Sequence, residues 1–98
     1  MTTYFTISQI KEANRARGHH FFEPATMRFF RSRVLRGVIG GRYFITSEQF
    51  ESSTGYRAPR KYSVRECLDN GEIRTHDEFQ AFETPAQARA AARKLAAA

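Results

Sequence analysis

The sequence is poor in cysteine and in long apolar runs. With one cysteine in 98 residues, no disulfide can form within the chain, and a zinc site built from several cysteines is excluded. No apolar run approaches the roughly 20 residues that cross a bilayer, and the segment MTTYFTISQIKEANRARG lacks the apolar region of a signal peptide. We therefore expect a soluble cytoplasmic protein that contacts no membrane.

Acidic residues are missing from one long stretch. The sequence has no Asp or Glu between Glu23 and Glu48, where MRFFRSRVLRGVIGGRYF (residues 27–44) holds five arginines and four aromatic residues. Residues 1–65 carry twelve basic against four acidic residues, a net charge of +8, whereas residues 66–98 carry four against six, a net charge of −2. This separation predicts one basic face.

The amino-acid composition is that of a folded domain. Hydrophobic residues make up 41% of the chain, with nine Phe and four Tyr. Chains that stay disordered lack the aromatic and branched residues that offset the loss of chain entropy. The length is also within the usual range of one domain. We therefore predict a single domain over residues 1–98.

Two helices are predicted in the first third of the chain. Thr6 or Ser8 can cap a helix that extends to Arg17. A second helix is predicted from Pro24, because proline is tolerated at the first helical position. Helical spacing favours burial of one of its sides, and we expect it to end near residues 31–35. The residues on that buried side are Met27, Phe30 and Val34.

Three strands and a last helix are predicted in the rest of the chain. GRYFITSEQF (residues 41–50) is rich in residues that favour extended backbone. KYSVRECL (residues 61–68) alternates like a half-buried strand, and DNG (residues 69–71) is typical of a hairpin that returns along residues 72–82. Thr84, followed by proline, can cap the final helix.

The fold predicted from these elements is α+β. In KYSVRECL the residues expected to point into the core are Tyr62, Val64 and Leu68, and those expected to point outward are Ser63, Arg65 and Cys67. We predict a three-stranded antiparallel sheet with one or two short N-terminal helices and a C-terminal helix, all packed on one face of the sheet.

The basic stretch is the candidate binding site. If its arginines converge with those of the neighbouring strand, they form a patch that can follow phosphates. The residues of this predicted patch are Arg28, Arg31, Arg33, Arg36, Arg42, Arg60, Lys61 and Arg65. The aromatic residues between them, Phe29, Phe30, Tyr43 and Phe44, could stack on bases. Core packing is the more common role of aromatic residues at such mixed helix and strand spacing, so both interpretations stay open.

No catalytic or metal-binding pattern is found in the sequence. His19 and His20 are adjacent and have no partner at a spacing that completes a metal site. Cys67 is predicted within a strand, away from the helix N-terminus or positioned histidine that lowers a thiol pKa. The glycines of residues 37–41 match neither a phosphate loop nor the GxGxxG pattern. We therefore expect a protein that is not an enzyme and has no cofactor or metal.

Four segments of the chain stand out together: HHFFEPATMRFFRSRV, GRYFITSEQF, RKYSVREC and GEIRTHDEFQAFETPAQARAAARK. They resemble a family of small uncharacterised proteins of bacteriophages and other mobile elements, over roughly residues 19–94. This resemblance implies an accessory protein in the bacterial host cytosol and carries over no functional residue. The C-terminal part also resembles double-stranded RNA binding domains in element order, although only Arg89 matches their phosphate-gripping lysines.

Two functions are compatible with these observations. The first is a small phage-type accessory protein that inhibits a bacterial defence machine, such as a CRISPR effector, by stoichiometric occlusion. Its partner would be a host protein or a ribonucleoprotein complex. The alternative is a direct nucleic-acid-binding protein, regulatory or architectural, that uses the arginine-rich face.

Overall fold

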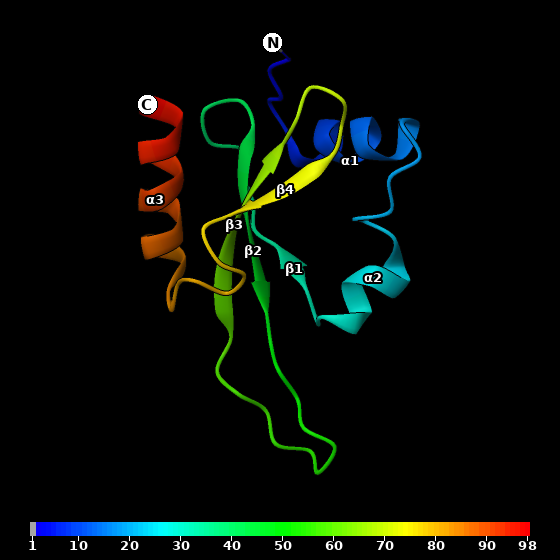
Figure 1. The fold of residues 1–98 in the computed structure, drawn as a ribbon, viewed down its shortest axis with the longest axis vertical. Helices are drawn as coiled ribbons and strands as arrows, with labels where there is room; N and C mark the ends of the chain where they lie inside the picture. Colours follow the sequence, from blue (N-terminus) through cyan, green and yellow to red (C-terminus); the bar gives the residue numbers. More distant parts are fainter. Residues whose placement is uncertain (1) are drawn as a thin grey trace.

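The computed structural model describes residues 2–98 and shows an α+β protein with an antiparallel sheet (Figure 1). Its helices are α1 (Ile7–Ala16), α2 (Pro24–Phe29) and α3 (Pro85–Ala97). Its strands are β1 (Arg33–Val34), β2 (Tyr43–Glu48), β3 (Lys61–Cys67) and β4 (Ile73–His76). Within residues 2–98, none of the helices has the length and apolar character needed to cross a membrane. The predicted α+β class is confirmed.

The sheet of the described residues has four strands in the order β1-β2-β3-β4, where three were predicted. The additional strand is β1, in which Arg33 pairs with Ser47 and Val34 with Thr46 of β2. β1 lies where the second helix was expected to end. Arg31 has a φ of 48°, which an α-helix cannot continue, and the β-branched Val34 then favours extended backbone.

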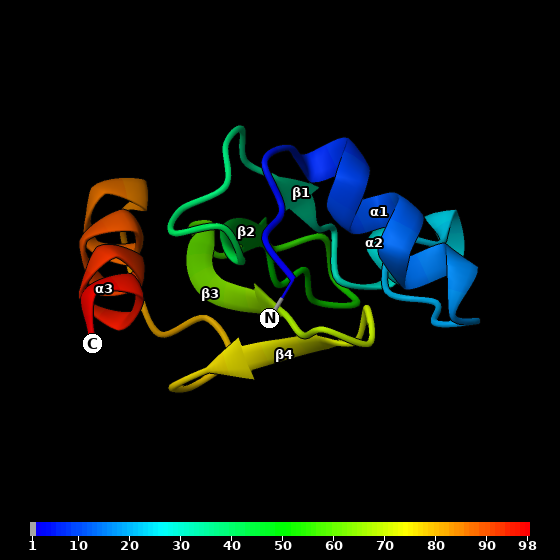
Figure 2. The same ribbon diagram turned by 90° about the horizontal axis from the view of Figure 1, so that it is seen from above.

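The helices lie on both faces of the sheet, which makes three layers (Figure 2). On the α3 side the buried apolar residues are Ile45, Val64, Ala88 and Ala92. On the α1 side they are Tyr4, Ile10, Phe22, Phe44 and Cys67. The prediction that all helices pack on one face is therefore wrong, because both faces of β2 and β3 carry side chains that need cover.

β3 is buried on both sides, contrary to the predicted alternation. Ser63, Arg65 and Cys67 were expected to point outward, yet Ser63 and Cys67 are fully buried and Arg65 is 8% exposed. The polar atoms of Ser63 and Arg65 find partners on β2. Ser63 Oγ donates to Glu48 Oε1 at 2.7 Å, and Arg65 Nε donates to Thr46 Oγ1 at 2.9 Å. A polar face can thus be buried when the next strand supplies its hydrogen-bonding partners.

α2 is shorter and more exposed than predicted. It has six residues, and none of them is buried. Phe30 follows its last residue and is 43% exposed, while Val34 belongs to β1. The predicted buried side of this helix is therefore wrong for Phe30, and Met27 is only partly buried. As a result, α2 does not close over the sheet.

The predicted caps of α1 and α3 and the predicted hairpin turn are confirmed. Thr6 caps α1 by accepting a hydrogen bond from the Gln9 backbone N–H, and the Gln9 side chain bonds back to the Thr6 backbone. Thr84 caps α3 by accepting from the Gln87 backbone N–H. Gly71 adopts a φ of 82° in the predicted hairpin turn. These signals involve neighbours in sequence, which is why they could be recognised there.

Gly71→Ala is expected to destabilise the fold strongly. The φ of 82° strains an alanine, and an added Cβ would lie 2.4 Å from the Ala13 carbonyl oxygen of α1. We expect a loss of about 2–4 kcal/mol in the free energy of unfolding, measured by chemical denaturation. Gly55→Ala is the matched control, because Gly55 has a φ of 90° but nothing within 4 Å of the added Cβ. Equal losses in the two variants would contradict a tight contact between Gly71 and α1.

Candidate interaction surface

The structure brings four of the eight predicted basic residues together at one concave site, which we call the basic hollow. Its lining residues are Pro24, Met27, Arg28, Arg31, Ser32, Arg33 and Arg60. Arg60 reaches this site from the segment before β3. Its Nη1 donates to the Arg31 carbonyl oxygen at 2.9 Å and to Ser47 Oγ at 3.0 Å. Hydrogen bonds therefore hold the Arg60 guanidinium beside Arg31, in the hollow that Arg28 and Arg33 also line.

The basic hollow carries a surplus of positive charge. Its four guanidinium groups are accompanied by the carboxylate of Glu51, which pairs with Arg31 and also lies 3.4 Å from Arg57 Nε. The pKa of Arg60 is lowered, mainly by burial and to a smaller extent by the positive charge of Arg33. Arg60 stays charged near neutral pH, because a guanidinium keeps its proton in proteins. An anion in this hollow would reduce the repulsion between these groups.

The other four predicted residues lie elsewhere. Arg36 lines a separate hollow beside α1, and Lys61 is exposed at the start of β3. Arg42 is paired with Glu66, and its side chain is 13% exposed. Arg65 is buried beneath the layer that contains α1. The eight residues therefore do not share one surface. Two of them, Arg42 and Arg65, pair with the carboxylates of Glu66 and Glu48 within the domain.

An exposed group of phenylalanines lies next to the basic hollow. Phe29 is 80% exposed, Phe50 60%, Phe79 45% and Phe30 43%. The ring centroids of Phe29 and Phe30 are 4.8 Å apart and those of Phe30 and Phe79 are 5.6 Å apart, both with edge-to-face geometry. All four rings line one shallow hollow together with Arg31. We call these four phenylalanines the aromatic surface.

Sequence reasoning located only part of this surface. Core packing was the more common role expected for Phe29, Phe30, Tyr43 and Phe44. It is confirmed for the fully buried Phe44 and for Tyr43, which packs against the core on the α3 side, and it is wrong for the two others. Phe50 and Phe79 were not singled out, because the predicted strands of residues 41–50 and 72–82 included them. In the structure both lie beyond the ends of β2 and β4. The available signal was Phe29, which falls outside the predicted buried side of its helix.

A cavity of about 300 Å³ lies between α2 and β3, and we call it the α2 cavity. Its lining residues are Phe21, Thr26, Met27, Phe30, Ser32, Arg65 and Phe79. The Arg65 Cζ lies 5.1 Å from the Phe21 ring centroid and 5.5 Å from the Phe79 ring centroid. Burial lowers the pKa of Arg65, although the Glu48 carboxylate opposes this shift. The wall of the cavity thus combines aromatic rings with one buried guanidinium.

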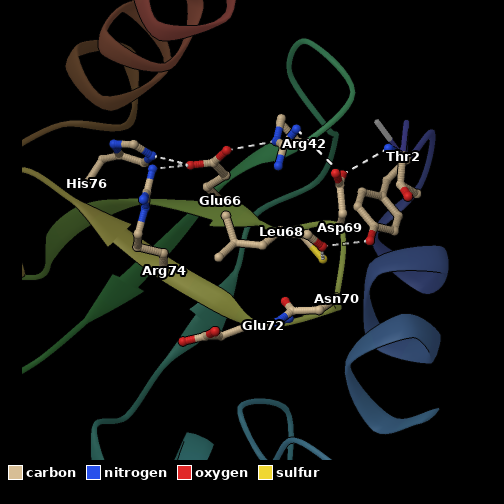
Figure 3. A network of polar contacts seen from close by, with 11 residues as sticks. Thr2, Arg42, Glu66, Leu68, Asp69, Asn70, Glu72, Arg74 and His76 are labelled. Carbon is tan, nitrogen blue, oxygen red and sulfur yellow. Dashed lines mark hydrogen bonds and ion pairs between the residues drawn. The ribbon is translucent and has the colours of Figure 1, made fainter. Parts of the chain in front are cut away.

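A second polar cluster surrounds Glu66 on the α3 side of the sheet (Figure 3). Its carboxylate lies 2.7 Å from Arg42 Nε, 2.9 Å from Arg74 Nη2 and 2.6 Å from His76 Nε2. Burial opposes ionisation, but the His76 hydrogen bond and the two arginine charges outweigh it and lower the pKa of Glu66. Arg42 Nη1 also lies 3.7 Å from Asp69 Oδ1 in the hairpin turn. The cluster therefore ties the segment before β2 to the β3–β4 hairpin.

Cysteine and metal chemistry find little support in the geometry. Cys67 is fully buried, and burial raises the pKa of its thiol. A reactive cysteine has the opposite properties, a lowered pKa and access to solvent. Across residues 2–98, no three side chains of His, Cys, Asp or Glu are grouped so that they could hold a metal ion.

Comparison with known proteins identifies a family but no activity. The family model of DUF7447, described as a family of unknown function, matches residues 6–93 of the 98. No curated protein and no solved structure gives a significant match. The match does not test the expected phage origin or the resemblance to double-stranded RNA binding domains, and both stay predictions.

Glu66→Gln is expected to lower stability in a pH-dependent way. The folded-state pKa of Glu66 is below its ordinary value, so its stabilising contribution is full above the unfolded-state pKa of about 4.3. The contribution is lost as the pH falls through the lower folded-state pKa. Near pH 7 we expect a loss of about 3 kcal/mol, because Arg42 is left without its buried partner.

Chemical denaturation of wild type and Glu66→Gln, from about pH 7 down to about pH 3, checks this. The stability difference between the two proteins should shrink toward the acid end. Glu78→Gln is the control, since Glu78 is exposed and outside the cluster, and it should behave like wild type. A stability difference that stays constant with pH would contradict the role of the Glu66 charge.

Proposed function

The chain belongs to DUF7447, a family of unknown function, and we propose that it is a non-enzymatic binding protein that acts by stoichiometric occlusion of a macromolecular partner. The observation that carries this proposal is the aromatic surface beside the basic hollow. Phe29 and Phe50 are more than half exposed, at 80% and 60%. Contiguous apolar patches of this kind mark interaction sites in soluble proteins.

The residue types of this surface support a protein partner. Aromatic residues and arginine are enriched at protein interfaces, and a few buried anchors of these types supply most of the binding free energy. Phe29 and Phe30 are available as anchors, and Arg31 lies between them and the basic hollow. Each of these residues lies within or directly after α2, so one short segment would contribute most to binding.

The partner that we propose is a component of a bacterial defence machine, such as a CRISPR effector. The resemblance to small phage proteins supports this choice, together with the small size of the chain. Machines that handle nucleic acids often carry acidic surfaces next to their binding channels, and an arginine-rich protein can cover these. Occlusion needs no catalytic group, which agrees with the buried, unreactive environment of Cys67.

A second candidate function, direct nucleic-acid binding, is favoured by one observation. Arg28, Arg31, Arg33 and Arg60 surround a hollow that adjoins exposed phenylalanine rings. Basic grooves with aromatic platforms are typical of single-strand binding proteins, because every base offers a stacking face. The four arginines form a cluster and not a long track, which favours the first proposal over this one.

Expression of the chain in bacteria that carry a defence system is expected to restore phage infection, measured as plaque counts. Phe29→Ser should lose most of this effect, because a central aromatic anchor contributes about 2 kcal/mol or more to binding. Phe5→Ser is the matched control, since Phe5 is 75% exposed and lies in a separate hollow beside α1. Failure of the wild-type chain to restore infection across several defence types would refute the defence-machine proposal.

Fluorescence anisotropy with single-stranded DNA, duplex DNA and duplex RNA distinguishes the second candidate. If it holds, affinity should fall by orders of magnitude between about 50 and 200 mM salt, because each neutralised phosphate releases counterions. It should also fall in Arg28→Ala combined with Arg33→Ala, and remain in Arg93→Ala on the exposed side of α3. We expect weak binding at both salt concentrations, in line with a protein partner. Tight, salt-dependent binding would reverse this preference.

A further inference from the structure

Three concave sites of this surface are neighbours that share lining residues. The α2 cavity shares Phe30 and Phe79 with the hollow of the aromatic surface. It shares Met27 and Ser32 with the basic hollow. Arg31 lines both the basic hollow and the hollow of the aromatic surface. A group that enters the α2 cavity therefore has aromatic rings on one side and guanidinium groups on another.

The α2 cavity is open because α2 ends before it packs onto the sheet. Arg31 adopts a φ of 48°, and the Ser32 N–H donates to the Met27 carbonyl oxygen at 2.8 Å. No residue of α2 is buried against the sheet. The cavity volume of about 300 Å³ is at the lower end of ligand sites, so it has room for one bulky side chain.

The lining of the α2 cavity selects a neutral, apolar group. Arg65 is its charged lining residue, and the protein itself compensates this charge. Arg65 Nε donates to Thr46 and Nη1 donates to Thr75. Arg65 Nη2 lies 3.5 Å from the Glu48 carboxylate. A charged group that enters the cavity would lose its hydration and find no free charge to pair with, because Arg65 is already paired. An aromatic ring loses little hydration and can also lie against the Arg65 guanidinium.

The basic hollow, which lies next to the α2 cavity, favours negatively charged groups. Arg28 and Arg33 are exposed, and neither forms an ion pair within residues 2–98. Arg31 and Arg60 lie in the same hollow, and Glu51 is the carboxylate that pairs with Arg31. Carboxylates fit arginine well, since a guanidinium can bind them with two parallel hydrogen bonds.

We propose that the α2 cavity and the basic hollow together bind an acidic segment of the partner protein that inserts one bulky apolar side chain. The apolar side chain enters the α2 cavity between α2 and β3. The acidic residues that flank it pair with Arg28, Arg31, Arg33 and Arg60. This assignment rests on the proposed function, and it specifies the chemistry that the partner offers.

A protein segment fits this site better than a nucleotide does. A base carries donors and acceptors around its edge, and these lose free energy when they are buried without partners. Apart from the compensated Arg65, the side-chain polar groups of the α2 cavity are the hydroxyls of Thr26 and Ser32. Leucine, methionine and phenylalanine have no such groups to satisfy.

Binding of fluorescein-labelled peptides to the full chain tests the proposal. The probe is a short peptide of Asp and Glu residues around one central Phe, and its two matched forms carry Ala in place of Phe or Lys in place of the acidic residues. An oligothymidylate of similar length is the nucleic-acid probe. We expect the acidic Phe peptide to bind at least about tenfold more tightly than each of the other three probes.

Two sets of variants measure the contributions of the α2 cavity and of the basic hollow to binding separately. Thr26→Trp places a large side chain at the α2 cavity and should weaken the Phe peptide about tenfold, toward the affinity of the Ala peptide. Ala90→Trp, at an exposed position of α3, is its control. Arg28→Glu with Arg33→Glu should weaken binding by a similar factor, whereas Arg93→Glu with Lys94→Glu, which changes the net charge equally, should not. Circular dichroism verifies that each variant is folded, and the charge variants remain informative if Thr26→Trp does not fold.

Three outcomes would overturn the proposal. Equal binding of the Phe and Ala peptides would show that the α2 cavity takes no side chain. Tighter binding of oligothymidylate would assign the site to nucleic acid. Restoration of infection that depends on Phe29, together with no binding of the acidic Phe peptide, would refute the acidic segment and leave the proposed occluding function in place.

Discussion

Both faces of the β2–β3 pair are buried, and the other elements are placed where they cover it. On one face Ile45 and Val64 lie beneath the small residues of α3. The opposite face carries a buried ion pair, Glu48 with Arg65, in addition to apolar residues. Because an unpaired charge at such a site costs about 3–5 kcal/mol, this face tolerates its polar character only while the strands stay in register. The strand register and the layer that contains α1 are therefore linked.

Features of the fold that depend on residues close in sequence could be predicted, whereas features that depend on contacts between separate elements could not. The caps at Thr6 and Thr84 and the hairpin turn at Gly71 involve residues a few positions apart, and all three were predicted. The alternation of β3 was misread, because Ser63 and Arg65 look like solvent-facing residues until the covering layer is known. β1 was missed for a related reason, since two residues that pair with a distant strand leave no periodic pattern.

The distribution of charge in the sequence located part of the basic hollow, but the sequence did not show the aromatic surface beside it. The acid-free stretch located Arg28, Arg31 and Arg33 at the surface, and these do converge with Arg60. Charge counting could not separate them from Arg65, which is an internal partner of Glu48. Core packing was the more common role expected for Phe29 and Phe30, whereas both lie outside the core because α2 ends before it can cover the sheet. The proposed binding surface is thus a consequence of a helix of six residues.

The two outer strands of the sheet are short. β1 pairs with β2 over two residues, and β4 has four residues and ends at His76, where the following Asp77 has a φ of 55°. Outer strands of this length offer few free backbone groups to which a strand of another chain could add. The recognition that we propose therefore depends on side chains and not on continuation of the sheet. Its specificity can then change by substitution of single residues on and around α2, while the backbone of the domain stays the same.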